Sequence, residues 1–269
     1  MADALTGTGP ASTKRAAPSD GVAVRKIGIA DIRHALARGL DDFMEIPTQL
    51  VFLGILYPII GFVTVRATAG GELLPLLFPL VAGLSLVGPV LALGLYELSR
   101  RREQGREVSW INAFDVFRSR AIFSIAVLGV ALFAVFVAWV GAARAIYALT
   151  VGGAAPASVG SFAQLLLDTP RGWALIVVGN LVGFLFAAFV LATSIVSFPM
   201  LLDRDVGPMV AVRTSVRAVL TNPGPMAVWG LVVAGLLALG CLPVFIGLAV
   251  AMPVLGHATW HLYRRVVAP

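Results

Sequence analysis

Long apolar runs with few charges alternate with shorter polar segments along this chain, and their lengths predict helices that cross a membrane. A helix rises about 1.5 Å per residue, so about 20 apolar residues cover the roughly 30 Å hydrocarbon core of a bilayer. The runs that meet this condition are 48–65, 73–98, 121–149, 173–198 and the long stretch 226–263. The pattern predicts an all-α polytopic bundle.

The last of these runs is too long for one crossing. As a single helix, 226–263 would extend roughly 57 Å, nearly twice the hydrocarbon thickness of about 30 Å. Cys241-Leu242-Pro243 lies inside it, and proline disfavours a continuing helix. We therefore expect two spans joined by a tight turn near these residues, which makes six transmembrane helices in all.

Three shorter segments carry apolar residues at spacings of three and four, which is typical of amphipathic helices lying in the membrane interface. Pro47 ends the first segment, Ser109 is positioned to cap the second, and Asn222-Pro223-Gly224-Pro225 ends the third. Their apolar faces are Ile29, Ile32, Leu36, Leu40 and Phe43; then Trp110, Phe114 and Phe117; then Met209, Val212, Val216 and Val219.

Each amphipathic segment precedes two spans, so the chain has the outline of a threefold internal repeat. The second span of each unit contains a short Pro-[Val/Met]-Leu element, at Pro89, Pro199 and Pro253. After the first and last of these prolines, an aromatic residue follows at the seventh position and arginines follow at the eleventh and twelfth. The alternative is coincidence, because so apolar a chain produces such elements by chance.

The beginning of the chain has a different character. Residues 1–26 are rich in Ala, Gly, Ser, Thr and Pro and contain no apolar core of a signal peptide. This composition predicts a disordered cytoplasmic tail. Residues 27–269 are then expected to form one six-span membrane domain.

Composition supports a membrane protein and indicates its partners. The chain is 59% hydrophobic and 13% charged, with a mean hydropathy of +0.93, whereas a soluble domain is nearer half apolar and a quarter charged. The net charge of +6 comes from basic residues grouped between the apolar runs. This grouping favours anionic lipid head groups as partners, and it excludes nucleic acid, which needs a continuous basic face.

The distribution of basic residues predicts the orientation. With six spans, the loops and ends on the side of the N-terminus hold 17 of the 20 lysines and arginines. Only Arg66, Arg144 and Arg171 lie in or near segments on the opposite side. Because short cytoplasmic loops carry an excess of basic residues, we expect both termini in the cytoplasm.

Two histidines near the C-terminus are the strongest candidates for metal or haem binding. His257 and His261 are four residues apart and share a helix face, although no HExxH glutamate lies between them. A further ligand would have to come from Glu97, Asp203 or Asp205. The alternative is that His257 forms a hydrogen bond inside the bundle. In that interpretation, the ending acts as an interfacial anchor made of Trp260, Tyr263, Arg264 and Arg265.

Few polar residues fall within the spans, and each has a structural and a functional interpretation. Asn180 is suited to a hydrogen bond between helices, and it lies within a stripe of small residues, Gly179, Gly183 and Ala187, that favours close helix packing. Arg144 is suited to reaching the outer head groups. In a transporter, Asn180 and Arg144 would instead line the substrate path. Glu97 and Asp203 are the remaining polar candidates, and Asp203 is expected to pair with Arg204.

Motifs of soluble enzymes are absent from the sequence. It contains no GxSxG elbow, no GxxxxGK loop and no dinucleotide-binding glycine pattern after a strand. Cys241 is the only cysteine, which rules out an intrachain disulfide or a thiolate zinc site. We therefore assign no catalytic residue.

Four segments carry a resemblance to a known family. They are Gly88–Arg100, Ser197–Asp203, Asn222–Gly230 and Leu255–Arg264, and they cover much of the chain beyond the tail. The chain resembles bacterial integral membrane proteins of domain-of-unknown-function family 2189, which implies a location in the inner membrane. Some members carry a cytochrome c oxidase subunit I label, but that catalytic subunit holds two haems and a copper through six histidines. This chain has three histidines, so the resemblance leaves only a role beside a respiratory complex.

Three functions remain open from the sequence. The first is a non-enzymatic structural or accessory protein that binds lipids or partner membrane helices, including a second copy of itself, and needs no cofactor. The second is a metal- or haem-associated accessory protein of a respiratory complex that uses His257 and His261. The third is a transporter of small solutes.

Overall fold

The computed structural model describes residues 22–46, 59, 71–84, 88–152, 156–242 and 246–268. Within these residues the elements are helical, apart from one isolated β-bridge between Val24 and Val267. The all-α prediction is therefore confirmed for this part of the chain. The helices are α1 (Ile29–Glu45), η1 (Gly71–Leu76), α3 (Leu77–Leu84), α4 (Gly88–Leu91), α5 (Leu93–Glu103), η3 (Trp110–Arg118), α6 (Ile122–Val151), α7 (Val159–Asp168), α8 (Pro170–Ser194), α9 (Ser197–Asp203), α10 (Pro208–Thr221), α11 (Pro223–Cys241) and α12 (Leu248–Val266).

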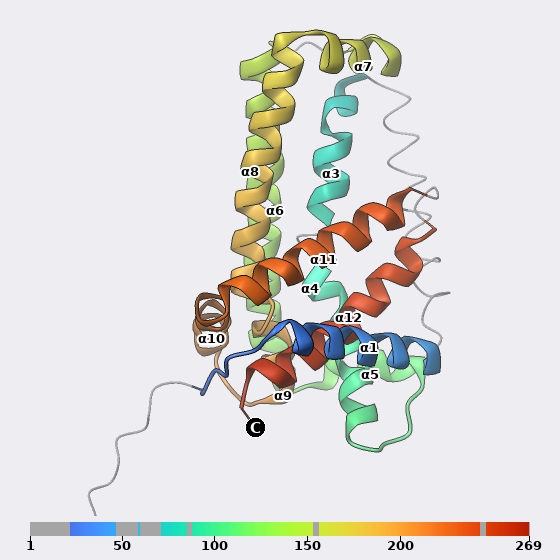
Figure 1. The fold of residues 1–269 in the computed structure, drawn as a ribbon, viewed down its shortest axis with the longest axis vertical. Coiled ribbons are helices and arrows are strands. Elements are labelled where there is room, and N and C mark those ends of the chain that lie inside the picture. The colour runs from blue at the N-terminus through green and yellow to red at the C-terminus, as the bar shows by residue number, and fades with distance from the viewer. Residues whose placement is uncertain are drawn as a thin grey trace, which may run out of the picture.

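Among the described residues, three helical units are long and apolar enough to cross a membrane: α6, the combined α8–α9 unit and α11. The 30 residues of α6 extend about 45 Å. Figure 1 shows α6 and α8 running side by side, whereas α11 and α12 are inclined to them. These units correspond to the predicted spans 121–149 and 173–198 and to the first part of 226–263.

The other three predicted spans are not confirmed, and neither is the threefold repeat. The predicted span 48–65 lies outside the described residues except for Ile59. Of the predicted span 73–98, residues 85–87 lie outside the described part, and the described residues belong to η1, α3, α4 and α5. Prolines in this apolar run remove backbone donors and disturb the helix. The end of 226–263 forms α12, which is largely buried and is not one of the three candidate spans.

Two changes of direction have local causes. Helix α8 gives way to α9 at Ile195 and Val196, since the ring of Pro199 clashes with the carbonyl four residues earlier. The Val196 N–H donates to Ser215 Oγ on α10 at 3.2 Å. Helix α11 ends at Cys241, so the prediction that 226–263 divides near this residue is confirmed.

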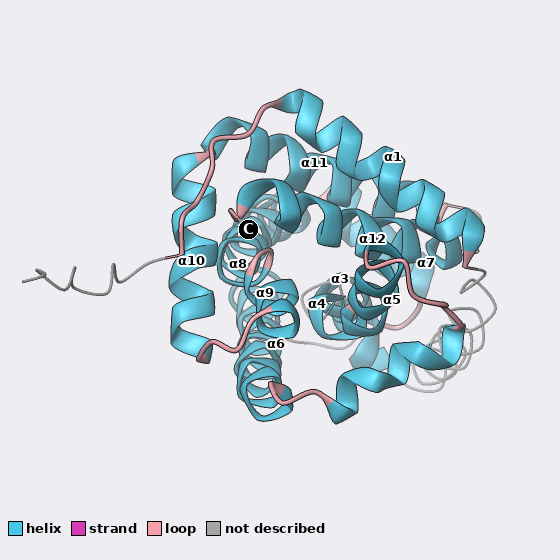
Figure 2. Ribbon diagram, turned by 90° about the horizontal axis from the view of Figure 1, so that it is seen from below, coloured by secondary structure: helices cyan, strands magenta, loops and turns pink. Residues whose placement is uncertain are grey.

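The shorter helices form a polar layer at one end of α6 and α8. It consists of α1, α5, α9 and the C-terminal half of α12, which lie together at the lower end in Figure 1 and face the viewer in Figure 2. Helix α1 crosses α12 so closely that a Cβ at Gly39 would lie 2.6 Å from the Ala258 backbone nitrogen. Only glycine permits this approach.

The two described ends of the chain meet in this layer. The Arg25 N–H donates to the Val266 carbonyl at 2.8 Å, and the Ala268 N–H donates to the Ala23 carbonyl at 3.1 Å. Asn222 accepts from the Ile27 N–H at 2.8 Å. Residues 22–26, which were assigned to the disordered tail, are thus hydrogen-bonded to the C-terminus, whereas residues 1–21 lie outside the described part.

All three predicted amphipathic segments are helical, as α1, η3 and α10, although η3 is a 3₁₀ helix. The faces that pack against the rest of the protein include small and polar residues beside the apolar ones. In α1, Ile29 and Leu40 are exposed, whereas Asp42 is fully buried. In α10, Met209 is exposed and the small residues Ala211, Ser215 and Ala218 are buried. Close contact with neighbouring helices selects small residues here, because they let the backbones approach.

Candidate functional site

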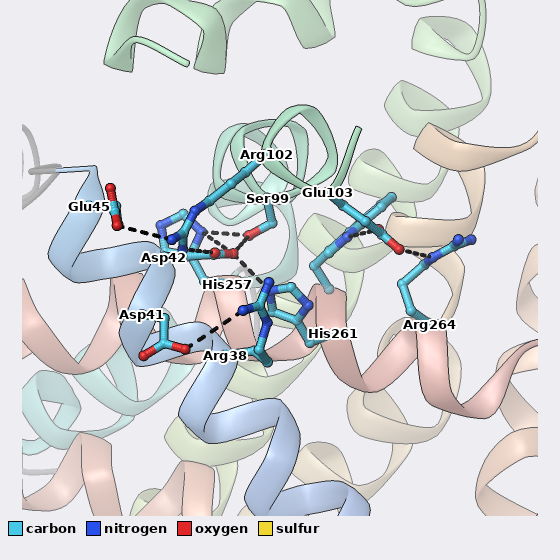
Figure 3. A network of polar contacts seen from close by, with 11 residues as sticks. Arg38, Asp41, Asp42, Glu45, Ser99, Arg102, Glu103, His257, His261 and Arg264 are labelled. Carbon is cyan, nitrogen blue, oxygen red and sulfur yellow. Dashed lines mark hydrogen bonds and ion pairs between the residues drawn. The ribbon is translucent and has the colours of Figure 1, made fainter. Parts of the chain in front are cut away.

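A buried carboxylate lies where α1, α5 and α12 meet (Figure 3). Asp42 of α1 is 0% exposed and accepts three hydrogen bonds from two other helices. Ser99 Oγ donates to Oδ2 at 2.6 Å, His261 Nε2 lies 2.8 Å from the same oxygen, and Arg102 Nη1 donates to Oδ1 at 2.5 Å. Together with His257, which contacts Ser99, these residues form what we call the polar cluster.

The hydrogen-bond geometry fixes the protons of the cluster. An ionised carboxylate only accepts hydrogen bonds, so the Ser99 hydroxyl donates its one proton to the hydrogen bond with Asp42. His257 Nδ1 lies 2.8 Å from Ser99 Oγ and must therefore donate to it. His261 must donate from Nε2 to Asp42 for the same reason.

The surroundings set the pKa of Asp42. Burial raises the pKa of this carboxyl, but hydrogen bonds from His261 and Ser99, the nearby His261 ring and the hydrogen bond from Arg102 outweigh burial and lower the pKa to about 2. Asp42 is therefore ionised at neutral pH. Arg102 also reaches Glu45 at 3.3 Å, so this one arginine joins α5 to two carboxylates of α1.

The cluster contains serine, histidine and aspartate, but it lacks the arrangement of a hydrolase. In a catalytic triad one histidine bridges the serine and the carboxylate. Here Ser99 bonds Asp42 directly, and His257 Nδ1 is 3.9 Å from Asp42 Oδ2. Ser99 and His257 are both 0% exposed, so a substrate cannot reach the hydroxyl. The arrangement is suited to joining helices.

A second polar group ties α12 to α5 and α9. Glu103 accepts from Trp260 Nε1 at 3.0 Å and from Arg264 Nε at 3.0 Å. Asp203 accepts from the Tyr263 hydroxyl at 2.7 Å and from Arg264 Nη1 at 3.3 Å. The predicted interfacial anchors Trp260 and Tyr263 are thus 0% and 1% exposed and lie inside the protein.

The other arginine of the predicted anchor, Arg265, is exposed and lies 3.6 Å from Asp31 of α1. Glu97, another polar candidate, is 2% exposed and forms ion pairs with Arg100 at 2.9 Å and Arg101 at 3.0 Å. Both Glu97 and Asp203 are therefore engaged by arginines or by Tyr263, and neither lies beside the histidine pair.

The structure places both histidines of the predicted metal pair in the polar cluster. Each uses one ring nitrogen for a hydrogen bond to Ser99 or Asp42, and the buried Nε2 of His257 has no hydrogen-bond partner within the described residues. No group of three or more His, Cys, Asp or Glu side chains in the described ranges could hold a metal ion. In this geometry the two histidines join α12 to Ser99 and Asp42, and the metal site stays a prediction.

The intramembrane candidates lie elsewhere. Asn180 is exposed on α8, and its Nδ2 donates to the Ile176 carbonyl of the same helix at 2.8 Å. Arg144 is exposed on α6. Of the small-residue stripe, only Gly183 packs closely, since a Cβ there would lie 3.0 Å from the Trp139 ring. A Cβ at Gly179 would meet nothing within 4 Å, and Ala187 is exposed.

Asp42, Ser99, Arg102 and Glu103 were not identified from the sequence. One signal was available for Asp42: it continues the stripe of small residues Ala35 and Gly39 on α1. No comparable signal marks Ser99, because its partners lie 57 and 158 residues away along the chain.

Comparison with known proteins supports the membrane assignment. No curated protein and no solved structure matches the chain. Residues 77–203, which include α5, α6, α8 and α9, match domain-of-unknown-function family 2189, described as a predicted integral membrane protein. The resemblance drawn from the sequence is therefore confirmed over residues 77–203, the part of the chain that matches this family of predicted integral membrane proteins.

Proposed function

We propose that this protein is a non-enzymatic structural or accessory protein of the bacterial inner membrane, which binds another membrane helix along α8. The observation that carries the proposal is the exposure of α8. Only 6% of the most apolar 18-residue stretch of the α8–α9 unit is buried, and Val177, Leu181 and Phe184 are each at least 60% exposed. In a membrane such a face lies against lipid or against another helix.

One polar residue favours a helix over lipid alone. Asn180, Phe184 and Ala187 follow the spacing i, i+4 and i+7, so they share one face of α8, and all three are exposed. The carboxamide of Asn180 bonds only its own helix among the described residues. Amide hydrogen bonds between membrane helices stabilise association by about 0.6–2 kcal/mol, and the small Ala187 allows close approach.

The buried polar layer supports the non-enzymatic part of the proposal. Its ionisable groups hold α1, α5, α9 and α12 together, and the serine and histidines of the polar cluster are at most 9% exposed. The exposed positions of Asn180 and Arg144 on separate helices do not favour the transporter hypothesis.

The orientation is part of the proposal. The two described chain ends are hydrogen-bonded to each other, so they share one side, and the segment 100–120 with its six arginines lies on the same side. Short cytoplasmic loops are enriched in basic residues, which favours the cytoplasm for both ends. A reporter fused after Pro269 should be active in the cytoplasm, and activity confined to the periplasm would reverse this layout.

Photo-cross-linking in native membranes tests the α8 interface. A photoreactive benzoylphenylalanine at Phe184, which is 67% exposed, should give a discrete protein adduct. The matched control is the same substitution at Phe133 of α6, which is 57% exposed. An adduct of twice the chain mass would identify a second copy, and another discrete mass would identify a different partner. Lipid adducts alone at both positions would refute the interface.

A further inference from the structure

A cavity of about 460 Å³ opens beside the polar layer, between α5, η3, the start of α6 and the end of α9. Its wall is unusually rich in charge. Four carboxylates line it, from Glu97, Asp115, Asp203 and Asp205. Six arginines line it as well: Arg100, Arg101, Arg106, Arg118, Arg120 and Arg204. Six positive and four negative groups leave a surplus of two positive charges.

The buried carboxylates of the wall are already neutralised. Glu97 is paired with Arg100 and Arg101 at 2.9 and 3.0 Å. Asp115 is paired with Arg101 at 2.7 Å and accepts from the Asn112 amide at 3.0 Å. These pairs hold the wall in place, and Asp205 is the one carboxylate of the wall that is exposed and forms no ion pair with a described residue.

Two of the six arginines are free to bind an anion. Arg106 and Arg120 are exposed, and neither side chain forms an ion pair with any described residue. Arg106 is held by its backbone, since its N–H donates to the Arg101 carbonyl at 3.0 Å after a turn at Gly105 with φ of +66°. Guanidinium groups without an ion-pair partner are suited to phosphate oxygens, which they bind through paired N–H groups.

The start of α6 adds to the attraction for an anion. Ser119 and Ala121 line the cavity, and the N-cap residue Ala121 supplies no side-chain cap. The first turn of a helix carries N–H groups without an intrahelical partner and the positive end of the helix dipole; here the Ile122 N–H already donates to the Ser119 carbonyl at 3.1 Å, which leaves the following N–H groups of the turn. The Ser119 hydroxyl oxygen accepts from the Ala121 N–H at 3.2 Å, which leaves the hydroxyl proton free to donate.

An exposed aromatic face borders the cavity. Trp110, Phe114 and Phe117 of η3 are 49%, 54% and 70% exposed. Phe114 lies edge-to-face against Trp110 at a ring distance of 6.4 Å and stacks on Phe117 at 6.5 Å. Aromatic side chains of this kind settle at the membrane interface. With η3 at that depth, Arg106, Arg118 and Arg120 lie near the level of lipid phosphates.

We propose that this cavity binds a phosphate group, held by Arg106, Arg120, the Ser119 hydroxyl and the open first turn of α6. The chemistry is shared by the head group of an anionic phospholipid and by free phosphate. The aromatic face of η3 favours the lipid as the natural source. This inference is independent of the α8 interface.

Binding to the purified full-length protein tests the site. The test variant is Arg106→Gln/Arg120→Gln, whose arginines hold no described partner, so its folding should be unchanged. The control is Arg213→Gln/Arg217→Gln, because these two arginines of α10 are also exposed and unpaired among the described residues. In the first experiment, binding of inorganic phosphate is measured by titration. In the second, lipid retention and thermal stabilisation are measured in nanodiscs of phosphatidylcholine with and without phosphatidic acid.

The wild-type and control proteins should retain phosphatidic acid, and the test variant should bind it at least roughly tenfold more weakly, since a hydrogen bond to a charged group is worth about 1.5–3 kcal/mol. Displacement of the lipid by inorganic phosphate would show that the phosphate group alone is recognised. Retention of phosphatidic acid without such displacement would assign the site to a lipid head group. Equal binding by the test and control variants, or no binding by wild type, would overturn the site.

Discussion

The molecule has two contrasting regions. The long helices α6 and α8 expose apolar side chains, whereas the polar layer of α1, α5, α9 and α12 buries polar ones. On α8, Phe184, Leu185 and Phe189 are more than half exposed, whereas in the layer Asp42, Ser99 and His257 are fully buried. In a protein surrounded by water, both arrangements would be unfavourable, because apolar surface would be exposed to water and charged groups would be removed from it. The difference teaches that lipid surrounds the long helices, while the layer must satisfy its polar groups internally.

The two regions are also held together differently. In the layer, charged hydrogen bonds join helices that are far apart in the sequence, as between Asp42 and His261, 219 residues apart. Between α6 and α8 the contacts are apolar, such as Trp139 on Phe186 at a ring distance of 5.6 Å. Substitutions in the layer should therefore change stability strongly, and substitutions on the outer face of α8 should change association instead.

The largest effect is expected for Asp42→Ala. It removes the acceptor of Ser99, His261 and Arg102, and breaking a buried ion pair costs about 3–5 kcal/mol. We expect the free energy of unfolding in detergent to fall by this amount, measured by thermal or chemical denaturation. Asp41→Ala is the matched control, because Asp41 is exposed and lies 3.8 Å from an exposed Arg38; it should change stability by less than about 0.5 kcal/mol. Equal effects of the two substitutions would contradict the claim that the buried hydrogen bonds of Asp42 stabilise the layer.

The next largest effect is expected for Gly39→Ala. The new Cβ would lie 2.6–2.7 Å from the backbone of Ala258, and backbone cannot move aside as a side chain can. We therefore expect the free energy of unfolding to fall by about 3 kcal/mol, the upper end of the usual range for overpacking. Gly179→Ala on α8 is the control, since a Cβ there meets nothing within 4 Å. It should leave stability unchanged or raise it by up to about 1 kcal/mol. A stable Gly39→Ala protein would show that α1 does not cross α12 this closely.

Acid should weaken the layer through Asp42. Its pKa is lowered to about 2 from an ordinary 3.8, so the folded state binds fewer protons than the unfolded state between these values. The resulting stabilisation of about 2 kcal/mol is present above pH 3.8 and is lost as the pH falls towards 2. Unfolding measured from pH 5 to pH 2.5 should show this loss in the wild type. Asp42→Asn should have a shallower slope, and identical slopes would show that Asp42 does not titrate in this way.

The smallest effect on stability is expected for Asn180→Leu. The Asn180 amide bonds only the Ile176 carbonyl of its own helix, so the monomer in detergent should change by less than about 0.5 kcal/mol. Association through α8 should weaken, as measured by the yield of the Phe184 photo-adduct. A large loss of monomer stability with an unchanged adduct would place Asn180 inside the bundle rather than at an interface.

The sequence predicts the apolar helices well because length and hydropathy alone determine them. Residues 121–149 and 173–198 lie almost entirely within α6 and α8–α9, and the division near Cys241 follows from the bilayer thickness. The run 73–98 was harder to predict, since its prolines change a continuous apolar pattern into short helices. Hydropathy does not register such breaks.

The polar layer could be predicted only in part. The spacing of His257 and His261 shows that they share a face, but it does not reveal that Asp42 and Ser99 lie opposite them. On α1 the apolar residues, Ile29 and Leu40 among them, predict a face towards the membrane, whereas close contact with α12 depends on Ala35 and Gly39. Contacts between distant segments depend on backbone approach, which the pattern of a single helix does not contain.

The difference between the two regions can be measured directly by spin labelling in lipid vesicles. A Cys241→Ser protein would carry a label at position 184 on α8 or at position 41 on α1, two exposed sites where labelling should leave the fold unchanged. The label at 184 should collide mainly with oxygen, which dissolves in lipid, and the label at 41 should collide mainly with a water-soluble nickel complex. Equal access of the nickel complex to both labels would contradict the assignment of α8 to the membrane.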